Sequence, residues 1–290
     1  MIKKGIILAG GTGSRLSPIT KSINKQLLPL YDKPMIFYSL SVLMLAKIRD
    51  VLLITKKNDL KLYKELLGSG EDIGLKISYA IQEKPRGIPE AFIIGKKFIS
   101  DQNIALILGD NFFYGQGFTK KLLDEKRLKN GAKIFLYNVK NPEDYGSVEI
   151  ENDKIKNIKE KSKNIKSSFA ITGLYFFDND VIKYVKNLKL SKRKELEIVD
   201  LLKIYNKKNK LFFSLMGRGS AWLDTGSPEN LLSTSEFIST IENRQGLKIG
   251  CIEEIALINK WINKKNIIKR INFYGNSTYS NYLKKLISYA

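Results

Sequence analysis

The feature that most constrains the fold is a short apolar run that ends in a glycine loop near the start of the chain. Residues 4–9 read Lys-Gly-Ile-Ile-Leu-Ala and lead directly into Gly10-Gly11-Thr12-Gly13. A run of this kind is typical of a buried strand, and glycines let the backbone turn sharply where the strand ends. The sequence therefore predicts a strand followed by a tight, glycine-lined turn.

The same rhythm continues along the first half of the chain. Further strand-like runs alternate with helical segments: strands at 50–55, 76–81 and 104–108, and helices at 35–46, 58–67 and 89–99. Alternation at this spacing predicts βαβ units and a mostly parallel sheet with helices on both faces. In such a sheet, ligands bind at the carboxyl ends of the strands, and both Gly10 and Asp110 follow such ends.

After about residue 139 the rhythm changes. Short alternating segments at 147–151, 155–158 and 171–177 indicate a small antiparallel insertion, a loop is expected at 217–226, and the pattern from Pro228 onward is helical. We expect a catalytic domain over 1–246, with the insertion at about 139–176, and a helical C-terminal region over 247–290. The predicted fold class is a Rossmann-like, three-layer α/β/α fold.

Two residue counts restrict the chemistry. The chain of 290 residues has no histidine and one cysteine, so Ser-His-Asp catalysis, histidine-bound zinc and an internal disulfide are all excluded. A metal ion would have to be held by carboxylates, which favours a hard cation such as magnesium. No apolar run approaches the roughly 20 residues that a membrane span needs, and the N-terminus lacks a secretory signal pattern. We expect a cytoplasmic protein that does not enter a membrane.

The strong positive charge has two interpretations. Lys+Arg number 50 against 29 Asp+Glu, a net charge of +21, and nucleic-acid binding is one possible reason. However, most of the basic residues are lysines scattered over the whole chain, whereas specific nucleic-acid binding relies on arginines and clustered basic faces. We therefore expect no nucleic-acid partner, and keep a basic nucleic-acid-binding protein as an alternative.

The glycine loop carries cations that could bind phosphate. Backbone N–H groups in such a loop can surround phosphate oxygens, and Arg15 and Lys25 follow the loop closely. The pattern matches neither the dinucleotide-binding fingerprint nor the P-loop. A tight strand-to-helix turn without a ligand explains the loop equally well.

Two acidic residues are candidate metal ligands. Asp110 follows the apolar run 104–108, and Asp224 lies in Trp222-Leu223-Asp224-Thr225-Gly226. Two carboxylates from different strand ends can share one magnesium ion. Each alone is also ordinary turn chemistry.

Together, these motifs resemble those of the sugar nucleotidyltransferases, and in particular the bacterial glucose-1-phosphate thymidylyltransferases. The resemblance extends from residue 4 to about residue 251, and its motifs are Gly10–Arg15, Lys25-Gln26-Leu27-Leu28-Pro29, Asp32-Lys33-Pro34-Met35, Gly109-Asp110-Asn111 and Trp222–Gly226. It implies the nucleotidyltransferase fold and a magnesium-assisted reaction in which dTTP and α-D-glucose 1-phosphate give dTDP-glucose and pyrophosphate. This reaction would be a first step towards dTDP-L-rhamnose and related deoxysugars of surface polysaccharides.

The resemblance also implies residue roles. Arg15, Lys25 and Asp110 would be catalytic, and Asp110 and Asp224 would hold Mg²⁺. Nucleotide contacts are expected from Leu8, Gly10, Gly11, Thr12, Gly13, Ser14, Arg15, Lys25, Gln26, Gln82, Gly87 and Asp110. Sugar-phosphate contacts are expected from Tyr145, Gly146, Glu160, Lys161 and Thr172. A homotetramer is also implied.

The chain departs from the family pattern in places that affect these expectations. Arg86 stands where family members commonly have Asp, beside the residues expected to read the base. A UTP- or CTP-dependent sugar-1-phosphate pyrophosphorylase is therefore a second candidate. Tyr114, Gly115, Arg218 and Glu254 fall where longer relatives form a regulatory nucleotide-sugar site, but the region 247–290 could equally serve only to pack the assembly.

Overall fold

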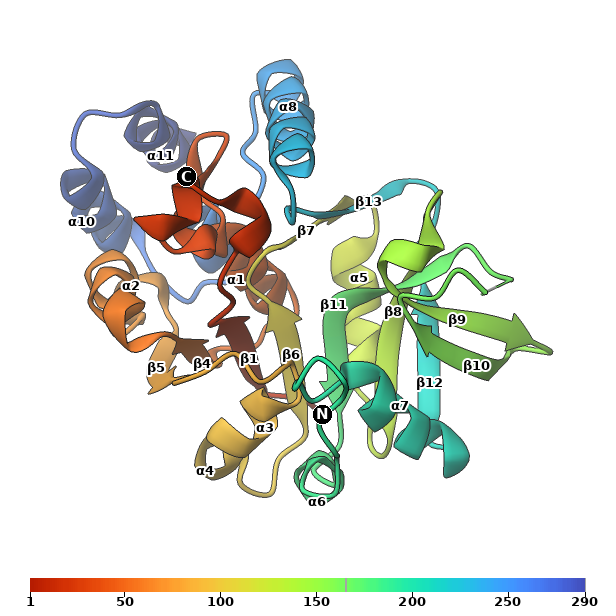
Figure 1. Ribbon diagram of the computed structural model, residues 1–290. Helices are drawn as coiled ribbons and strands as arrows, with labels where there is room; N and C mark the ends of the chain where they lie inside the picture. The colour runs from red at the N-terminus through yellow and green to blue at the C-terminus, as the bar shows by residue number, and fades with distance from the viewer. Residues whose placement is uncertain (165, 290) are drawn as a thin grey trace.

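The computed structural model describes residues 1–164 and 166–289, and a nine-stranded sheet forms its centre (Figure 1). The main path of the sheet has the order β10-β9-β11-β6-β1-β4-β5, while β8 pairs with β11 and β12 pairs with β8. The strands are β1 (Lys4–Ala9), β4 (Asp50–Thr55), β5 (Lys76–Ile81), β6 (Ile104–Leu108), β8 (Ala132–Asn138), β9 (Gly146–Glu151), β10 (Lys154–Glu160), β11 (Phe169–Phe177) and β12 (Leu211–Leu215).

The strands β5, β4, β1 and β6 are parallel and form one half of the sheet. Ile7 of β1 lies opposite Leu53 of β4 and Ile107 of β6, so these strands end at the same edge. β11 runs antiparallel to β6, β8 and β9, and begins the other half of the sheet. The parallel half with its antiparallel insertion confirms the fold class expected from the sequence.

Helices cover both faces of the sheet because the side chains of each strand alternate between two cores. The helices between the strands are α1 (Ile36–Leu45), α2 (Leu60–Leu67), α3 (Glu90–Ile94), α4 (Lys96–Ile99), α5 (Phe118–Glu125), α6 (Val181–Val185) and α7 (Ile198–Lys207). Ile7 belongs to a core shared with α1, α2, α5 and the C-terminal helices, whereas Ile6 belongs to a core shared with α3, α4, α6 and α7.

The C-terminal part of the chain is helical, as expected. It consists of α8 (Pro228–Gln245), α9 (Ile252–Ile258), α10 (Lys264–Tyr274) and α11 (Thr278–Tyr289), and Figure 1 shows α10 and α11 beside α2, at the end of the sheet away from β9 and β10. Cys251 and Tyr279 are buried in the same core as α1, so these helices share the core of the sheet. Within residues 1–164 and 166–289, no helix is long and apolar enough to cross a membrane.

A small two-stranded sheet departs from the sequence prediction. β7 (Asn111–Gly115) pairs antiparallel with β13 (Ser220–Asp224), so the expected loop at 217–226 contains a strand and the prediction was wrong there. A second short pair, β2 (Pro29–Leu30) with β3 (Lys33–Pro34), precedes α1. The helix expected at 89–99 is divided into α3 and α4 at Gly95.

Candidate active site

A cleft lies at the carboxyl ends of the parallel strands and consists of two adjoining cavities. The large cavity has a volume of about 760 Å³ and the small cavity about 280 Å³. Leu108 and Asp110 line both cavities, so Asp110 lies where the two meet. This is the edge of the sheet at which a parallel α/β fold binds its ligands.

The pairing of β7 with β13 brings the two candidate metal ligands into this cleft. Asp224 lies opposite Asn111 in the register of the two strands. Thr225 donates both its backbone N–H, at 3.2 Å, and its hydroxyl, at 2.9 Å, to the carbonyl oxygen of Asp110. The residue after Asp224 is therefore fixed to Asp110 itself, and both acids line the large cavity.

The side chain of Asp110 forms an ion pair with Lys25. Lys25 Nζ donates to Asp110 Oδ2 at 2.6 Å, and the side chains of Lys25 and Asp110 are 6% and 27% exposed. Burial raises the pKa of Asp110, but the Lys25 ammonium and hydrogen bonds from Lys25 and Asn111 outweigh it and hold this pKa below its usual value. Asp110 is therefore a carboxylate at neutral pH.

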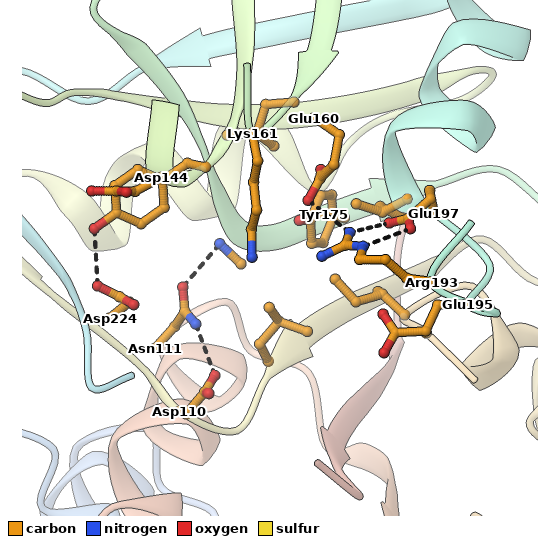
Figure 2. Close-up of a pocket in the computed structure, with 18 of the residues that line it drawn as sticks. Asp110, Asn111, Asp144, Glu160, Lys161, Tyr175, Arg193, Glu195, Glu197 and Asp224 are labelled. Carbon is orange, nitrogen blue, oxygen red and sulfur yellow. Dashed lines mark hydrogen bonds and ion pairs between the residues drawn. The ribbon is translucent and has the colours of Figure 1, made fainter. Parts of the chain in front are cut away.

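Asn111 connects three parts of the site. Its Oδ1 accepts a 2.6 Å hydrogen bond from Trp222 Nε1 and a 3.0 Å bond from the backbone N–H of Gly173, while its Nδ2 donates to Asp110 Oδ1 at 3.0 Å. Figure 2 shows Asn111 between Asp110 and the wall of the cavity formed by β11. The side-chain amide thus fixes β7, β11 and β13 relative to one another.

Asp224 is oriented by two neutral donors. Its Oδ1 accepts hydrogen bonds from Tyr145 OH, at 3.0 Å, and Asn230 Nδ2, at 2.9 Å. Burial, and then the nearby Asp224 carboxylate, raise the pKa of Tyr145 well above its ordinary value, so Tyr145 stays protonated and remains a donor. Tyr145 also packs edge-on against Trp222, with ring centroids 5.1 Å apart.

The two carboxylates are ligands that suit a hard divalent cation. Asp110 and Asp224 supply carboxylate oxygens to one cavity, and among the residues that the structure describes no cluster of three or more His, Cys, Asp or Glu side chains is found. Magnesium is commonly bound in this way, by one or two carboxylates together with water and substrate phosphates. A site for zinc or for a protein-enclosed calcium would need more protein ligands.

The far wall of the large cavity carries a charged group from β10 and the loop before α7. Arg193 contacts Glu160, at 3.2 Å, and Glu197, at 2.7 Å. The pKa of Glu160 is raised, mainly by burial. The cations Arg193 and Lys161 act to lower this pKa, while the neighbouring carboxylate of Glu197 acts to raise it further. Figure 2 shows the Lys161 side chain extending into the cavity between Asn111 and Arg193.

The glycine loop forms the other side of the cleft. Gly13 adopts a left-handed backbone with φ of 63°, and the 3₁₀ turn Ser14–Leu16 follows it. This turn carries Arg15 across to the strand β13: a Cβ added at Gly226 would lie 2.4 Å from an Arg15 guanidinium nitrogen. Arg15 therefore lies beside Asp224 on the wall of the large cavity.

Most of the residues expected from the sequence line the cleft. The lining residues among them are Leu8, Gly11, Thr12, Arg15, Gln26, Gln82, Gly87, Asp110, Tyr145, Gly146, Glu160, Lys161 and Asp224. The others, Gly10, Gly13, Ser14, Lys25 and Thr172, are not among the lining residues. Lys25 acts on the cleft through Asp110, whereas Thr172 is fully buried between the lining residues Ile171 and Gly173.

Two buried side-chain oxygens lack a hydrogen-bond partner within the described part of the chain. They are Gln26 Oε1 and Thr172 Oγ1. A buried acceptor without a donor costs about 1–3 kcal/mol. Since Gln26 lines the small cavity, a ligand that donates a hydrogen bond there would remove this cost.

Sequence reasoning missed several polar residues that line the large cavity, among them Asn111, Tyr175, Arg193, Glu197 and Asn230. The position of Asn111, directly after Asp110, was the available signal. Arg193 gave none, since it stands among lysines in a chain with 50 basic residues. Of the residues expected at a regulatory site, Tyr114, Gly115 and Glu254 line a separate cavity of about 280 Å³, and Arg218 does not.

Comparison with known proteins defines the class to which this fold and site belong. Residues 4–241 match the sequence profile of a family described as Nucleotidyl transferase. The chain therefore belongs to the nucleotidyl transferase family.

Relatives that match over nearly the full chain identify a smaller group within this family. A protein of Neisseria meningitidis named glucose-1-phosphate thymidylyltransferase is 50% identical over 285 residues, which are 98% of this chain and 99% of the relative. A Mycobacterium tuberculosis protein of the same name is 46% identical over the same shares of the two chains. Within the family, the chain belongs to the glucose-1-phosphate thymidylyltransferases.

Solved structures share the fold. One, described as a glucose-1-phosphate thymidylyltransferase from Bacillus anthracis in complex with a sucrose, has a TM-score of 0.75 and 40% identity, covering 81% of this chain and 94% of that chain. A UDP-glucose pyrophosphorylase solved with UDP-glucose has a TM-score of 0.73 and 25% identity, covering 83% of this chain and 100% of that chain.

Proposed function

We propose that this enzyme joins dTTP and α-D-glucose 1-phosphate to form dTDP-glucose and pyrophosphate. The observation that carries the proposal is the β7–β13 pairing, which brings Asp110 and Asp224 into one cleft with the cations Arg15 and Lys161. Such a cleft suits a reaction in which two highly charged phosphate groups meet.

The small cavity is where we place the nucleotide. It is lined by Gly11 and Thr12 of the glycine loop and by Gln26, Gln82 and Gly87. Gln82 and Gly87 would contact the base, and Gln26, whose Oε1 lacks a partner in the described structure, would contact the nucleotide beside it. The triphosphate would then extend past Asp110 towards Arg15.

The large cavity is where we place glucose 1-phosphate. Glu160, held by Arg193, would accept hydrogen bonds from sugar hydroxyls, while Tyr145 and Gly146 would enclose the sugar. Lys161 extends into the cavity, where its ammonium would pair with the sugar phosphate. Thr172 is buried behind this wall, so any contribution from it would come through the backbone.

The chemistry asks little of the side chains beyond position and charge. An oxygen of the sugar phosphate attacks the α-phosphorus of dTTP in line, the bond from that phosphorus to the bridging oxygen breaks, and pyrophosphate leaves. The second pKa of a phosphate monoester is about 6, so the attacking oxygen is already ionised at neutral pH and no general base is needed. This fits a chain without histidine.

Cations of the protein stabilise the transferring group. Arg15 and Lys25 would balance the charge of the triphosphate and of the departing pyrophosphate, while Lys161 holds the nucleophile. We propose that Asp110 and Asp224 bind Mg²⁺, which, when bound, neutralises phosphate charge and fixes the geometry of the phosphates.

A second candidate is the same reaction with UTP. It is favoured by Arg86, beside the base-reading residues, and by the structural likeness to a UDP-glucose pyrophosphorylase. Initial rates with glucose 1-phosphate and dTTP, UTP, CTP or ATP test the choice. We expect the highest kcat/KM with dTTP, and a clear preference for UTP would contradict the thymidylyl assignment.

Four further properties are proposed on the basis of the resemblance. We propose a homotetramer, which light scattering would detect as a mass four times the 33.1 kDa of one chain. We propose that residues 1–246 are the catalytic domain and that 247–290 contribute to assembly. A cytoplasmic location follows from the proposed use of dTTP, and a supply of dTDP-glucose towards dTDP-L-rhamnose and related deoxysugars follows from the proposed product.

A further inference from the structure

We propose that Glu90 fixes the side-chain amide of Gln82 and thereby makes the base pocket select a base with an N3–H group, so that cytosine is rejected. The inference rests on the proposed function, in which Gln82 contacts the base. Glu90 is a positioning residue in this account, because it acts through Gln82 and is not among the residues that line the cleft.

The contact between the two side chains is short and sheltered. Gln82 is 3% exposed and its Nε2 donates to Glu90 Oε2 at 2.7 Å. The backbone of Gln82 is fixed as well, since its N–H donates to the carbonyl oxygen of Thr55, at the end of β4, at 2.8 Å. Gln82 therefore has a defined position at the wall of the small cavity.

A glutamine amide has two ends of similar shape, one a donor and one an acceptor, and its orientation is set by its neighbours. A carboxylate only accepts hydrogen bonds. Next to Glu90, the Gln82 amide must therefore present its NH₂ group to the carboxylate and its carbonyl oxygen in the other direction. A neighbouring side chain that both donates and accepts, such as glutamine, would leave both orientations open.

The carbonyl oxygen lies against the glycine loop. A Cβ added at Gly10 would lie 2.1 Å from Gln82 Oε1, so the oxygen occupies space that only a glycine leaves free. Gly11 and Thr12, the next residues of the loop, line the same cavity as Gln82. The acceptor end of the amide is therefore on the side of the loop, where the nucleotide is proposed to bind.

Glu90 is itself anchored. It begins α3, and its side chain is 15% exposed. The backbone N–H of Arg86 donates to Glu90 Oε2 at 3.2 Å, and the Arg86 guanidinium Nε lies 4.0 Å from Glu90 Oε1. Because both carboxylate oxygens have a partner, the carboxylate cannot turn away from Gln82 without losing these contacts.

A fixed acceptor discriminates between bases by simple chemistry. Thymine and uracil carry a hydrogen on N3 and donate it to Gln82 Oε1, whereas N3 of cytosine is itself an acceptor. With cytosine, two acceptors would face each other, and a site built around one hydrogen bond rejects a ligand that cannot make it. Because thymine and uracil both carry the N3–H group, this hydrogen bond does not distinguish them, and the choice between them depends on other contacts.

The test compares kcat/KM for dTTP and CTP, both with glucose 1-phosphate, in the wild type and Glu90→Gln. A glutamine at position 90 donates as well as accepts, so the Gln82 amide becomes free to flip. We expect the dTTP/CTP ratio to fall about tenfold or more, mostly through a lower KM for CTP, with kcat for dTTP nearly unchanged. Glu90→Ala, which removes the acceptor, should lower the ratio in the same direction.

Glu83→Gln is the matched control, since it removes the same charge from an exposed residue of the same loop. Its ratio should equal that of the wild type. Each ratio is measured on one preparation, so the fraction of active enzyme cancels. A dTTP/CTP ratio in Glu90→Gln equal to the wild-type ratio overturns the role of Glu90 while leaving the proposed function intact. A wild type that releases no pyrophosphate from dTTP and glucose 1-phosphate overturns both.

Discussion

The indole of Trp222 donates a 2.6 Å hydrogen bond to Oδ1 of Asn111 and so joins the strand that ends at Asp224 to the strand that follows Asp110. Trp222 and Asn111 are each 5% exposed, so this bond is sheltered from water. This bond adds to the β7–β13 pairing and to the two hydrogen bonds from Thr225 to the Asp110 carbonyl oxygen, which also fix the relative position of the two acids. Asn111 is the first residue to test because its side chain also bonds to Asp110 and to Gly173 of β11.

Replacing Asn111 by Ala should reduce stability and activity together. The substitution leaves Trp222 Nε1 and the Gly173 N–H without their acceptor, and each unpaired buried donor costs about 1–3 kcal/mol. We expect urea unfolding to show a loss of about 2–4 kcal/mol. Trp222→Phe removes the indole donor but leaves Asn111 Oδ1 bonded to the Gly173 N–H, so this bond should contribute a smaller loss, about 0.5–1.5 kcal/mol. Equal stability of Asn111→Ala and wild type would refute the role of the amide.

Replacing Lys25 by Met should lower turnover more than stability. Lys25 Nζ lies 2.6 Å from Asp110 Oδ2 and is proposed to balance phosphate charge. The loss of one such cation typically reduces kcat by about 10²–10³. Steady-state kinetics would measure the change, with the exposed residue Lys21, also changed to Met, as the control. A Lys25→Met enzyme with near-normal kcat would exclude this role.

Asp110 should add an acid-sensitive part to the stability of the fold. Its pKa is lowered in the folded protein, so folding favours the carboxylate. This contribution is complete above the pKa of an unfolded aspartate, about 4, and is lost as the pH falls through the lower folded value. Urea unfolding of wild type and Asp110→Asn should therefore differ by a constant amount above about pH 5 and by less below about pH 4. A difference that grows on acidification would contradict the assignment.

The glycine loop offers a pair of substitutions that separate fold from binding. A Cβ at Gly10 would lie 2.1 Å from Gln82 Oε1, whereas a Cβ at Gly11 would meet nothing within 4 Å. Gly10→Ala should lower the melting temperature and raise the KM for dTTP, because Gln82 must move. Gly11→Ala should leave the melting temperature unchanged, which thermal denaturation of the two variants would show; equal melting temperatures would be incompatible with the packing described.

The sequence predicted the parts of the fold that depend on local pattern. β1, β4 and β6 are mostly continuous apolar runs, and the apolar segment at 35–46 became the buried helix α1. The pairing of β7 with β13 could not be predicted, because it joins segments far apart in the chain and because Phe112, Phe113 and Tyr114 lack the alternation of a half-exposed strand.

In the site, too, residues within local sequence motifs could be predicted, whereas residues placed by contacts between distant segments could not. Asp110 and Asp224 were predicted because each stands in a motif, and the structure brings both to one cavity. Arg193 was missed because a single cation in a lysine-rich chain has no distinguishing pattern, although it contacts Glu160. Thr172 was expected at the sugar phosphate, but the alternation of β11 turns the neighbouring residues Ile171 and Gly173 towards the cavity.

The most direct test is the release of pyrophosphate from dTTP, measured with and without glucose 1-phosphate and with and without Mg²⁺, in the wild type and in Asp224→Asn. We expect release only when glucose 1-phosphate and Mg²⁺ are both present. In Asp224→Asn we expect the rate to fall by a factor of about 10² or more. Release that needs no cation, or that continues at the wild-type rate in Asp224→Asn, would contradict the shared role of the two carboxylates.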